Sequence, residues 1–167
     1  MLFGGFALAK SRTTKPAKQS EIDAKQALKI KLRRMRRIQR ILASSGAISQ
    51  KGKKLFRLAQ LELEVSVLQE EEKDAAAALS AAETNARRLL IEVPKFSRAA
   101  EVRLLLARVL MRQKRYHQVV EVVDDIRHMH GKSGWGCEGD LLAASALNTI
   151  GRMKPSMLRY RDVMERK

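Results

Sequence analysis

The residues best suited to chemistry in this chain are arginines clustered in one short segment. Five of them lie within residues 31–40, KLRRMRRIQR. A guanidinium group keeps its charge at any physiological pH and can donate two parallel hydrogen bonds to one phosphate. The segment therefore predicts a phosphate-binding surface. The residues that we expect to contact phosphate are Lys29, Lys31, Arg33, Arg34, Arg36, Arg37, Arg40, Lys51, Lys53 and Lys54.

The positive charge is concentrated in the first third of the chain. Over 167 residues there are 34 Lys and Arg against 18 Asp and Glu, a net charge of +16. Residues 1–57 hold 16 of the basic and 2 of the acidic residues (+14), which leaves 18 and 16 (+2) for residues 58–167. A basic end on a near-neutral body is typical of polyanion binding, because each cation placed on a phosphate releases counterions. The polyanion is either nucleic acid or an anionic membrane surface.

We expect the arginines to lie on a helix that begins at Ser20, because a hydroxyl followed by Glu21 is a common N-terminal cap. Gly46 is expected to end this helix, and the lysines at 51–54 to lie in the loop that follows. No aromatic side chain interrupts the basic run, which favours the backbone of structured RNA over unpaired bases. The apolar side of the helix lacks Trp and Phe, which favours nucleic acid over lipid. One side of the helix carries an apolar stripe of Leu28, Leu32, Met35, Ile38 and Leu42.

The first 20 residues have the composition of a targeting segment. They contain four basic residues, several hydroxyls and no acid, and they resemble a mitochondrial or plastid transit peptide. The segment cannot bury enough surface to order itself, so we expect it to lie against a large partner where it is retained. No apolar run in the chain approaches the roughly 20 residues of a transmembrane helix, and a single Cys excludes an internal disulfide framework.

The rest of the chain is expected to be helical, since it is rich in Ala, Leu and Glu and poor in Gly and Pro. A three-four spacing of apolar and small residues predicts one long helix over residues 58–93, ended by Pro94. Its small residues Ala75, Ala82 and Ala86 permit a neighbouring helix to approach closely. Further helices are expected over residues 99–112, 116–129, 140–150 and 153–167, with a glycine-rich loop over residues 131–139.

The predicted fold class is therefore all-α, with two parts. Residues 1–57 form a basic extension with an Arg-rich amphipathic helix, and residues 58–167 form a body of antiparallel helical hairpins. Within the body, Leu79, Tyr116 and Met153 are spaced by 37 residues, and equal offsets lead to matching positions in each segment. These matching positions are Ala82, Val119 and Ser156, then Ala86, Val123 and Tyr160, then Leu89, Ile126 and Val163.

Segment 103–127, RLLLARVLMRQKRYHQVVEVVDDIR, resembles one unit of the tetratricopeptide family, whose units are helical hairpins. Leu106 and Ala107 match the large and small positions of the family's first helix, and Tyr116 matches the aromatic residue that opens the second. Arg103 and Val119 depart from that pattern. Segments 109–131 and 147–167 also resemble pentatricopeptide hairpins, but two units are too few for that family's code of one base per repeat. The resemblance covers residues 75–167 and implies antiparallel hairpins.

No residue pattern in the chain predicts catalysis, a metal site or a cofactor. The glycines between residues 134 and 139 match a dinucleotide-binding motif in letters only, because a helix precedes them instead of a strand. His128, His130 and Cys137 lack a fourth metal ligand, and Asp124 with its acidic neighbour is expected to be solvated. Trp135 is a candidate contact for a partner protein if it is exposed, and otherwise a plug at the end of the core.

These features together predict a non-enzymatic structural component of a large ribonucleoprotein, above all a ribosomal protein of the mitochondrial matrix. The basic arm would lie on the phosphates of rRNA, and the hairpins on neighbouring proteins. The alternative is a helical accessory or assembly subunit of a mitochondrial membrane complex. In that case the basic amphipathic helix would lie on an anionic membrane surface.

Overall fold

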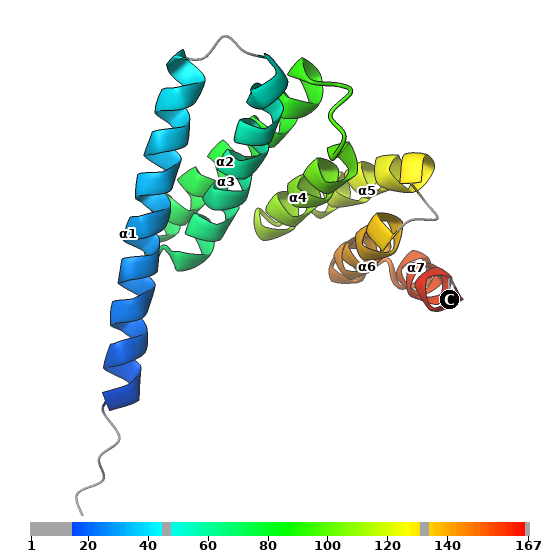
Figure 1. The fold of residues 1–167 in the computed structure, drawn as a ribbon. Helices are drawn as coiled ribbons and strands as arrows, with labels where there is room; N and C mark the ends of the chain where they lie inside the picture. Colours follow the sequence, from blue (N-terminus) through cyan, green and yellow to red (C-terminus); the bar gives the residue numbers. More distant parts are fainter. Residues whose placement is uncertain (1–14, 45–47, 131–133, 166–167) are drawn as a thin grey trace, which may run out of the picture.

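The computed structural model describes residues 15–44, 48–130 and 134–165, which form seven α-helices and no strand (Figure 1). For these residues the all-α prediction is confirmed. The helices are α1 (Lys15–Ser44), α2 (Ile48–Leu68), α3 (Glu72–Glu92), α4 (Ala99–Arg112), α5 (Tyr116–His130), α6 (Gly134–Thr149) and α7 (Met153–Glu165).

The helices stack in chain order, and short connections make most neighbours antiparallel (Figure 1). Helix α2 packs on α3, α4 on α5 and α6 on α7, while contacts of α3 with α4 and of α5 with α6 join these pairs. Helix α4 also touches α2 and α6. Within the described part of the chain, the backbone of α1 packs on α2 alone and that of α7 on α6 alone. Helices α1 and α7 therefore form the two ends of the row.

One hydrophobic core runs through helices α2 to α6. It is built from Leu55, Phe56, Ala59, Leu79, Ala82, Ala86, Leu89, Val102, Leu105, Leu106, Ala107, Val109, Leu110, Val119, Val123, Ala143 and Ala146. Ala82 and Ala86 are fully buried, as expected for small residues at a close helix contact. The boundary expected between residues 57 and 58 falls inside α2, and Leu55 on one side shares this core with Ala59 on the other.

The prediction of one long helix over residues 58–93 is wrong, because the chain reverses at residues 69–71. Three consecutive acids, Glu70, Glu71 and Glu72, interrupt the apolar seam at this point. Glu71 has an extended backbone, and Glu72 and Asp74 lie in the first turn of α3, where carboxylates interact favourably with the helix dipole. The two halves of the seam consequently face each other across the α2–α3 pair.

The expected loop around Lys51, Lys53 and Lys54 is also wrong, because these residues belong to the first turns of α2. Gly52 is buried there against the ring of Phe96, and a Cβ at this position would lie 3.0 Å from Phe96 Cδ2. The glycine therefore serves close packing inside a helix instead of ending one.

The basic helix begins earlier than expected. Helix α1 starts at Lys15, and Ser20 lies inside it instead of capping it. Pro16 fits this start, since a proline in the first turn of a helix lacks only an N–H group that would have no partner in the helix. The helix ends at Ser44, and the expected terminator, Gly46, lies outside the described residues.

The glycine-rich loop expected over residues 131–139 is wrong from Gly134 onward, where α6 begins. Gly136 and Gly139 are buried, and a Cβ on Gly139 would lie 3.3 Å from Val123 Cγ1 of α5. The missing side chain of Gly139 thus lets α6 approach α5 closely. Residues 131–133 lie outside the described part of the chain.

The predicted bounds of α4 and α5 agree with the structure to within one residue, and α7 begins at Met153 as predicted. Helix α4 has the predicted bounds, and α5 begins at Tyr116 after a turn over residues 113–115. Gly151 has a φ of 77° between α6 and α7, a conformation that favours glycine. The spacing of 37 residues places Ala82, Val119 and Ser156 at matching buried positions of α3, α5 and α7.

A buried carboxyl group lies between α2 and α3. Glu62 is only 1% exposed, and Asn85 Nδ2 donates to its two carboxyl oxygens at 2.9 and 2.8 Å. Burial raises the pKa of Glu62 to about 7, and the hydrogen bonds from Asn85 oppose this rise only in part. The folded protein therefore binds a proton at Glu62 more tightly than the unfolded chain does.

Replacement of this group should stabilise the protein above neutral pH. Ionisation of Glu62 costs about 3 kcal/mol of folding free energy, given a pKa of about 7 against 4.5 for an unperturbed glutamate side chain. The cost is absent below pH 4.5, grows as pH rises toward 7 and is constant above it. We expect Glu62→Gln to raise the unfolding free energy by about 2 kcal/mol at pH 8.5 and to flatten its pH dependence. Urea titrations at several pH values measure this, with the exposed Glu121→Gln as the unchanged control.

Candidate nucleic-acid interface

Helix α1 has two opposite faces. The apolar stripe of Leu28, Leu32, Met35, Ile38 and Leu42 is half-buried against α2. Lys29, Arg33, Arg36 and Arg40 follow one another at spacings of four, three and four residues and are exposed. This spacing sets their side chains in one line along the helix, about 16 Å long at 1.5 Å per residue. We call these four residues the basic stripe; it points away from the body.

Arg34 and Arg37 are exposed beside the basic stripe. Among the described residues, no acid forms an ion pair with these two arginines or with any member of the stripe. Most arginines in α3 to α7, by contrast, are neutralised by a nearby carboxylate. Arg88 and Glu92 are 2.7 Å apart, for example, and Arg115 and Glu83 are 2.6 Å apart. Helix α1 therefore carries a continuous group of cations that no described acid neutralises, and this group can attract polyanions.

Two of the ten expected phosphate contacts instead hold helices together. Lys31 lies on the side of α1 that faces α2 and pairs with Glu64. Lys51 Nζ lies 2.7 Å from Glu92 Oε2 and links α2 to the end of α3. Lys53 is exposed on α2, and Lys54 is half-buried there. Eight of the ten residues thus keep their charge free of ion pairs within the described part of the chain.

Trp135 lies in the first turn of α6 and is 39% exposed. It lines a groove over α2, α4 and α6 together with Phe56, Leu104, Leu105 and Arg108. Arg108 and Glu138 form an ion pair that joins α4 to α6 along this groove. The indole is thus available at the surface, on a face formed by three helices.

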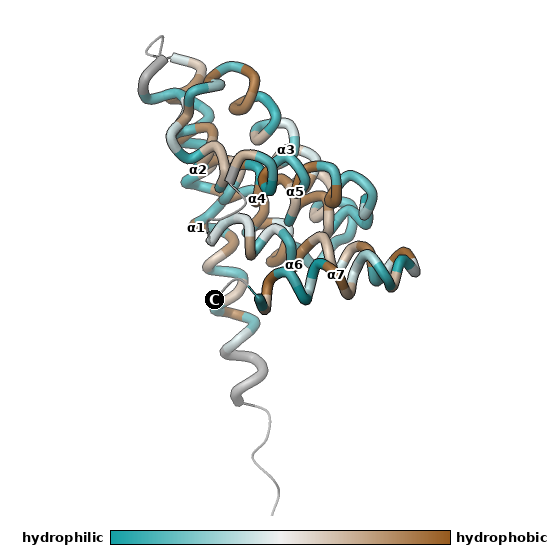
Figure 2. The backbone as a smooth tube through the Cα atoms, turned by 90° about the vertical axis from the view of Figure 1, so that its right-hand side faces the viewer, coloured by the Kyte–Doolittle hydropathy of each residue, from teal (hydrophilic) through white to brown (hydrophobic). Residues whose placement is uncertain are grey.

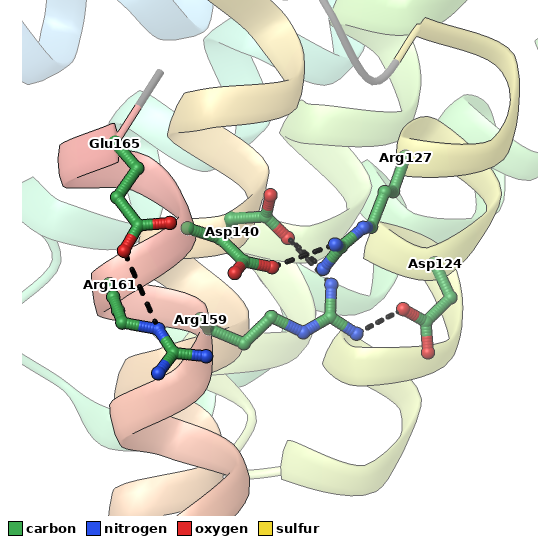
Figure 3. Close-up of polar contacts among 7 residues, drawn as sticks. Asp124, Arg127, Asp140, Arg159, Arg161 and Glu165 are labelled. Carbon is green, nitrogen blue, oxygen red and sulfur yellow. Dashed lines mark hydrogen bonds and ion pairs between the residues drawn. The ribbon is translucent and has the colours of Figure 1, made fainter. Parts of the chain in front are cut away.

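A network of charged side chains joins α5, α6 and α7, and the sequence did not indicate it (Figure 3). Arg159 donates to the buried Oδ1 of Asp140 at 2.6 Å and also pairs with Asp124. Arg127 donates to Asp162 at 2.7 Å and has a second nitrogen 3.7 Å from Asp140. Asp124 is therefore paired instead of merely solvated. The partners are 19 and 35 residues apart along the chain, so no local spacing reveals them.

The described residues contain no group of three or more His, Cys, Asp or Glu placed to hold a metal ion. None of the helices, within the ranges that the structure covers, is both long and apolar enough to span a bilayer. The glycines at 134, 136 and 139 lie on a helix that follows another helix, which is not the setting of a dinucleotide-binding loop. The targeting-like residues 1–14 lie outside the described part of the chain.

Comparisons of the chain with family models, with curated proteins and with solved structures find no match. The resemblance to tetratricopeptide units therefore rests on the residues of this chain alone. The function of the protein is likewise inferred from the charge and packing of its helices.

Proposed function

We propose that this protein is a structural component of a large ribonucleoprotein and binds the phosphate backbone of structured RNA through α1. The observation that carries the proposal is the basic stripe of Lys29, Arg33, Arg36 and Arg40, exposed and without ion pairs among the described residues. Arginine forks in a line can each bind a phosphate, and every contact releases counterions. Lys53 and Lys54 extend the positive surface onto α2.

The packing of α1 favours RNA over a membrane as the polyanion. An amphipathic helix binds a membrane by inserting its apolar face among the lipids. In this protein the apolar stripe of α1 is already packed on α2, and Lys31 pairs with Glu64 to hold it there. Membrane binding would have to break this contact, whereas the basic stripe reaches phosphates without any rearrangement.

We further propose that the body is an array of tetratricopeptide-like hairpins that contacts neighbouring proteins. The pairs α2–α3, α4–α5 and α6–α7 follow one another, and positions 37 residues apart are buried alike in α3 and α5. Trp135, at the edge of the groove over α2, α4 and α6, is the proposed anchor for one such neighbour. The protein has no enzymatic role in this proposal.

The mitochondrial matrix is the proposed location, and a mitochondrial ribosome is the proposed assembly. Support for both comes from the acid-free composition of residues 1–20, which is that of a transit peptide, and from the strongly basic first third of the chain. In the assembly, rRNA would be the ligand of α1.

A salt titration tests the proposal. Affinity of the full chain for a structured RNA hairpin, measured by fluorescence anisotropy, should fall steeply between about 50 and about 200 mM KCl. Five or six phosphate contacts predict a slope of log K against log[salt] of about −4 to −5. Vesicles containing phosphatidylserine provide the competing surface. Strong vesicle binding together with weak, salt-insensitive RNA binding would contradict the proposal and favour the membrane-complex alternative.

A further inference from the structure

Helix α7 carries an exposed apolar stripe at one end of the molecule. Met153, Met157, Tyr160 and Met164 follow at spacings of four, three and four residues, so they lie in one line. Met157 is 67% exposed and Met164 is 75% exposed. Figure 2 shows hydrophobic segments recurring along α7 between hydrophilic ones. We call these four residues the α7 stripe.

The positions of α3 and α5 that match Tyr160 of the α7 stripe are covered by a following helix. Val123 of α5, which matches Tyr160, is fully buried, and Gly139 of α6 approaches its side chain closely. Ala86, the matching residue of α3, is also fully buried, and α3 is flanked by both α2 and α4. The residue at this position is thus part of the core in α3 and α5, whereas Tyr160 of α7 is 40% exposed.

Ser156 and Arg159 of α7 attach this helix to α6 and α5. Ser156 Oγ donates to the carbonyl oxygen of Ala144 at 2.8 Å, and Arg159 reaches the buried carboxylate of Asp140 (Figure 3). These contacts hold α7 in one orientation on α6. The α7 stripe is therefore presented outward by a fixed helix, which lowers the entropic cost of docking a partner onto it.

We propose that the α7 stripe docks an amphipathic helix of a partner protein, with small residues on its apolar face and acidic residues on its flank. Small residues are expected because α6 approaches Val123 of α5 with Gly139, and because methionines adapt to a flat surface. Acidic residues are expected because Lys154 and Arg161 line a shallow groove on α7 with Met157 and Leu158. No acid among the described residues forms an ion pair with Lys154. Arg161 has Glu165 at 3.7 Å.

A second copy of this chain fits the α7 stripe poorly. Two α7 helices packed on each other would bring together Lys154 and Arg161 of both copies, and the Glu165 carboxylate beside each Arg161 would leave this contact with an excess of positive charge, which repels. An acidic helix instead gains attraction from the same two residues. This inference deepens the protein-contact part of the proposed function and rests on that part alone.

Photo-crosslinking in the native cells tests the docking. The full chain would carry p-benzoylphenylalanine in place of Met157, which is 67% exposed, or in place of Met129 of α5, which is 46% exposed, as a surface control. We expect position 157, and not 129, to yield one protein adduct, identified by mass spectrometry. The crosslinked segment should be an amphipathic helix with acidic residues. Lys154→Glu combined with Arg161→Glu should lower the adduct yield by about fivefold or more.

An adduct with a second copy of this chain, no protein adduct at 157, or an adduct that ignores the charge reversal would overturn the inference. An unchanged far-ultraviolet helix signal checks that these variants fold. Failure here with steep, salt-sensitive RNA binding intact would reject the α7 docking site and leave the RNA-binding proposal standing. Loss of RNA binding with the adduct intact would do the opposite.

Discussion

Reversing the charge of four α1 arginines should weaken RNA binding by about 100-fold or more at physiological salt. The variant combines Arg33→Glu, Arg36→Glu, Arg37→Glu and Arg40→Glu, all at exposed positions without ion pairs in the described part of the chain. Each lost phosphate contact removes nearly one unit of the salt slope, so the slope should fall to about −1. Fluorescence anisotropy with a structured RNA at several KCl concentrations measures both quantities.

A matched variant separates this specific surface from total charge. Lys73→Glu, Lys95→Glu, Arg112→Glu and Arg152→Glu alter the net charge equally, and these residues are also exposed and form no ion pair with a described acid. We expect this control to lower the affinity several-fold at most, through the long-range field alone. Equal losses for both variants would show that RNA binding follows net charge and does not depend on the α1 surface. The far-ultraviolet helix signal should be unchanged in both.

The two faces of α1 could be read from the sequence because they depend only on the helical period. Leu28 and Leu32 recur with that period on one side, and Arg33 and Arg36 fall on the other. The same local rule predicted the bounds of α4 and the turn at Gly151. What it could not show is which expected phosphate contacts are used within the protein. Lys31 pairs with Glu64, which is 33 residues away along the chain.

The wrong helix boundaries have a common physical cause: tertiary packing overrode a local signal. Glycine usually weakens a helix, yet Gly52 and Gly139 lie inside helices because Phe96 and Val123 occupy the space of their missing side chains. The spacing of apolar residues over 58–93 keeps the helical period on both sides of the acids at 70–72, so spacing alone predicts one helix. The chain reverses there, and the two shorter helices bury their apolar residues against each other and against α4.

Removal of the Asp140 carboxylate should destabilise the protein and release α7. Asp140 is fully buried, and it neutralises Arg159, which is itself largely buried, with Arg127 close by. Deleting one partner leaves the other charge desolvated, which typically costs about 3 to 5 kcal/mol. Asp124 and Asp162 keep some compensation on the two arginines, so we expect Asp140→Ala to cost about 3 kcal/mol, or about 10 °C in Tm. Differential scanning calorimetry measures this loss.

Hydrogen exchange and a double mutant show whether the effect is electrostatic and local. Within the described part of α7, Ser156 is the only fully buried residue. Helix α7 therefore depends on the charged network for its attachment to α6. Amide exchange in α7 should therefore accelerate in Asp140→Ala, while exchange in α2 and α3 stays slow. Adding Arg159→Met should recover part of the stability, because it removes the unpaired buried charge. Asp125→Ala, at an exposed position on α5, should be neutral; an equal loss there would show that the network contributes nothing to α7.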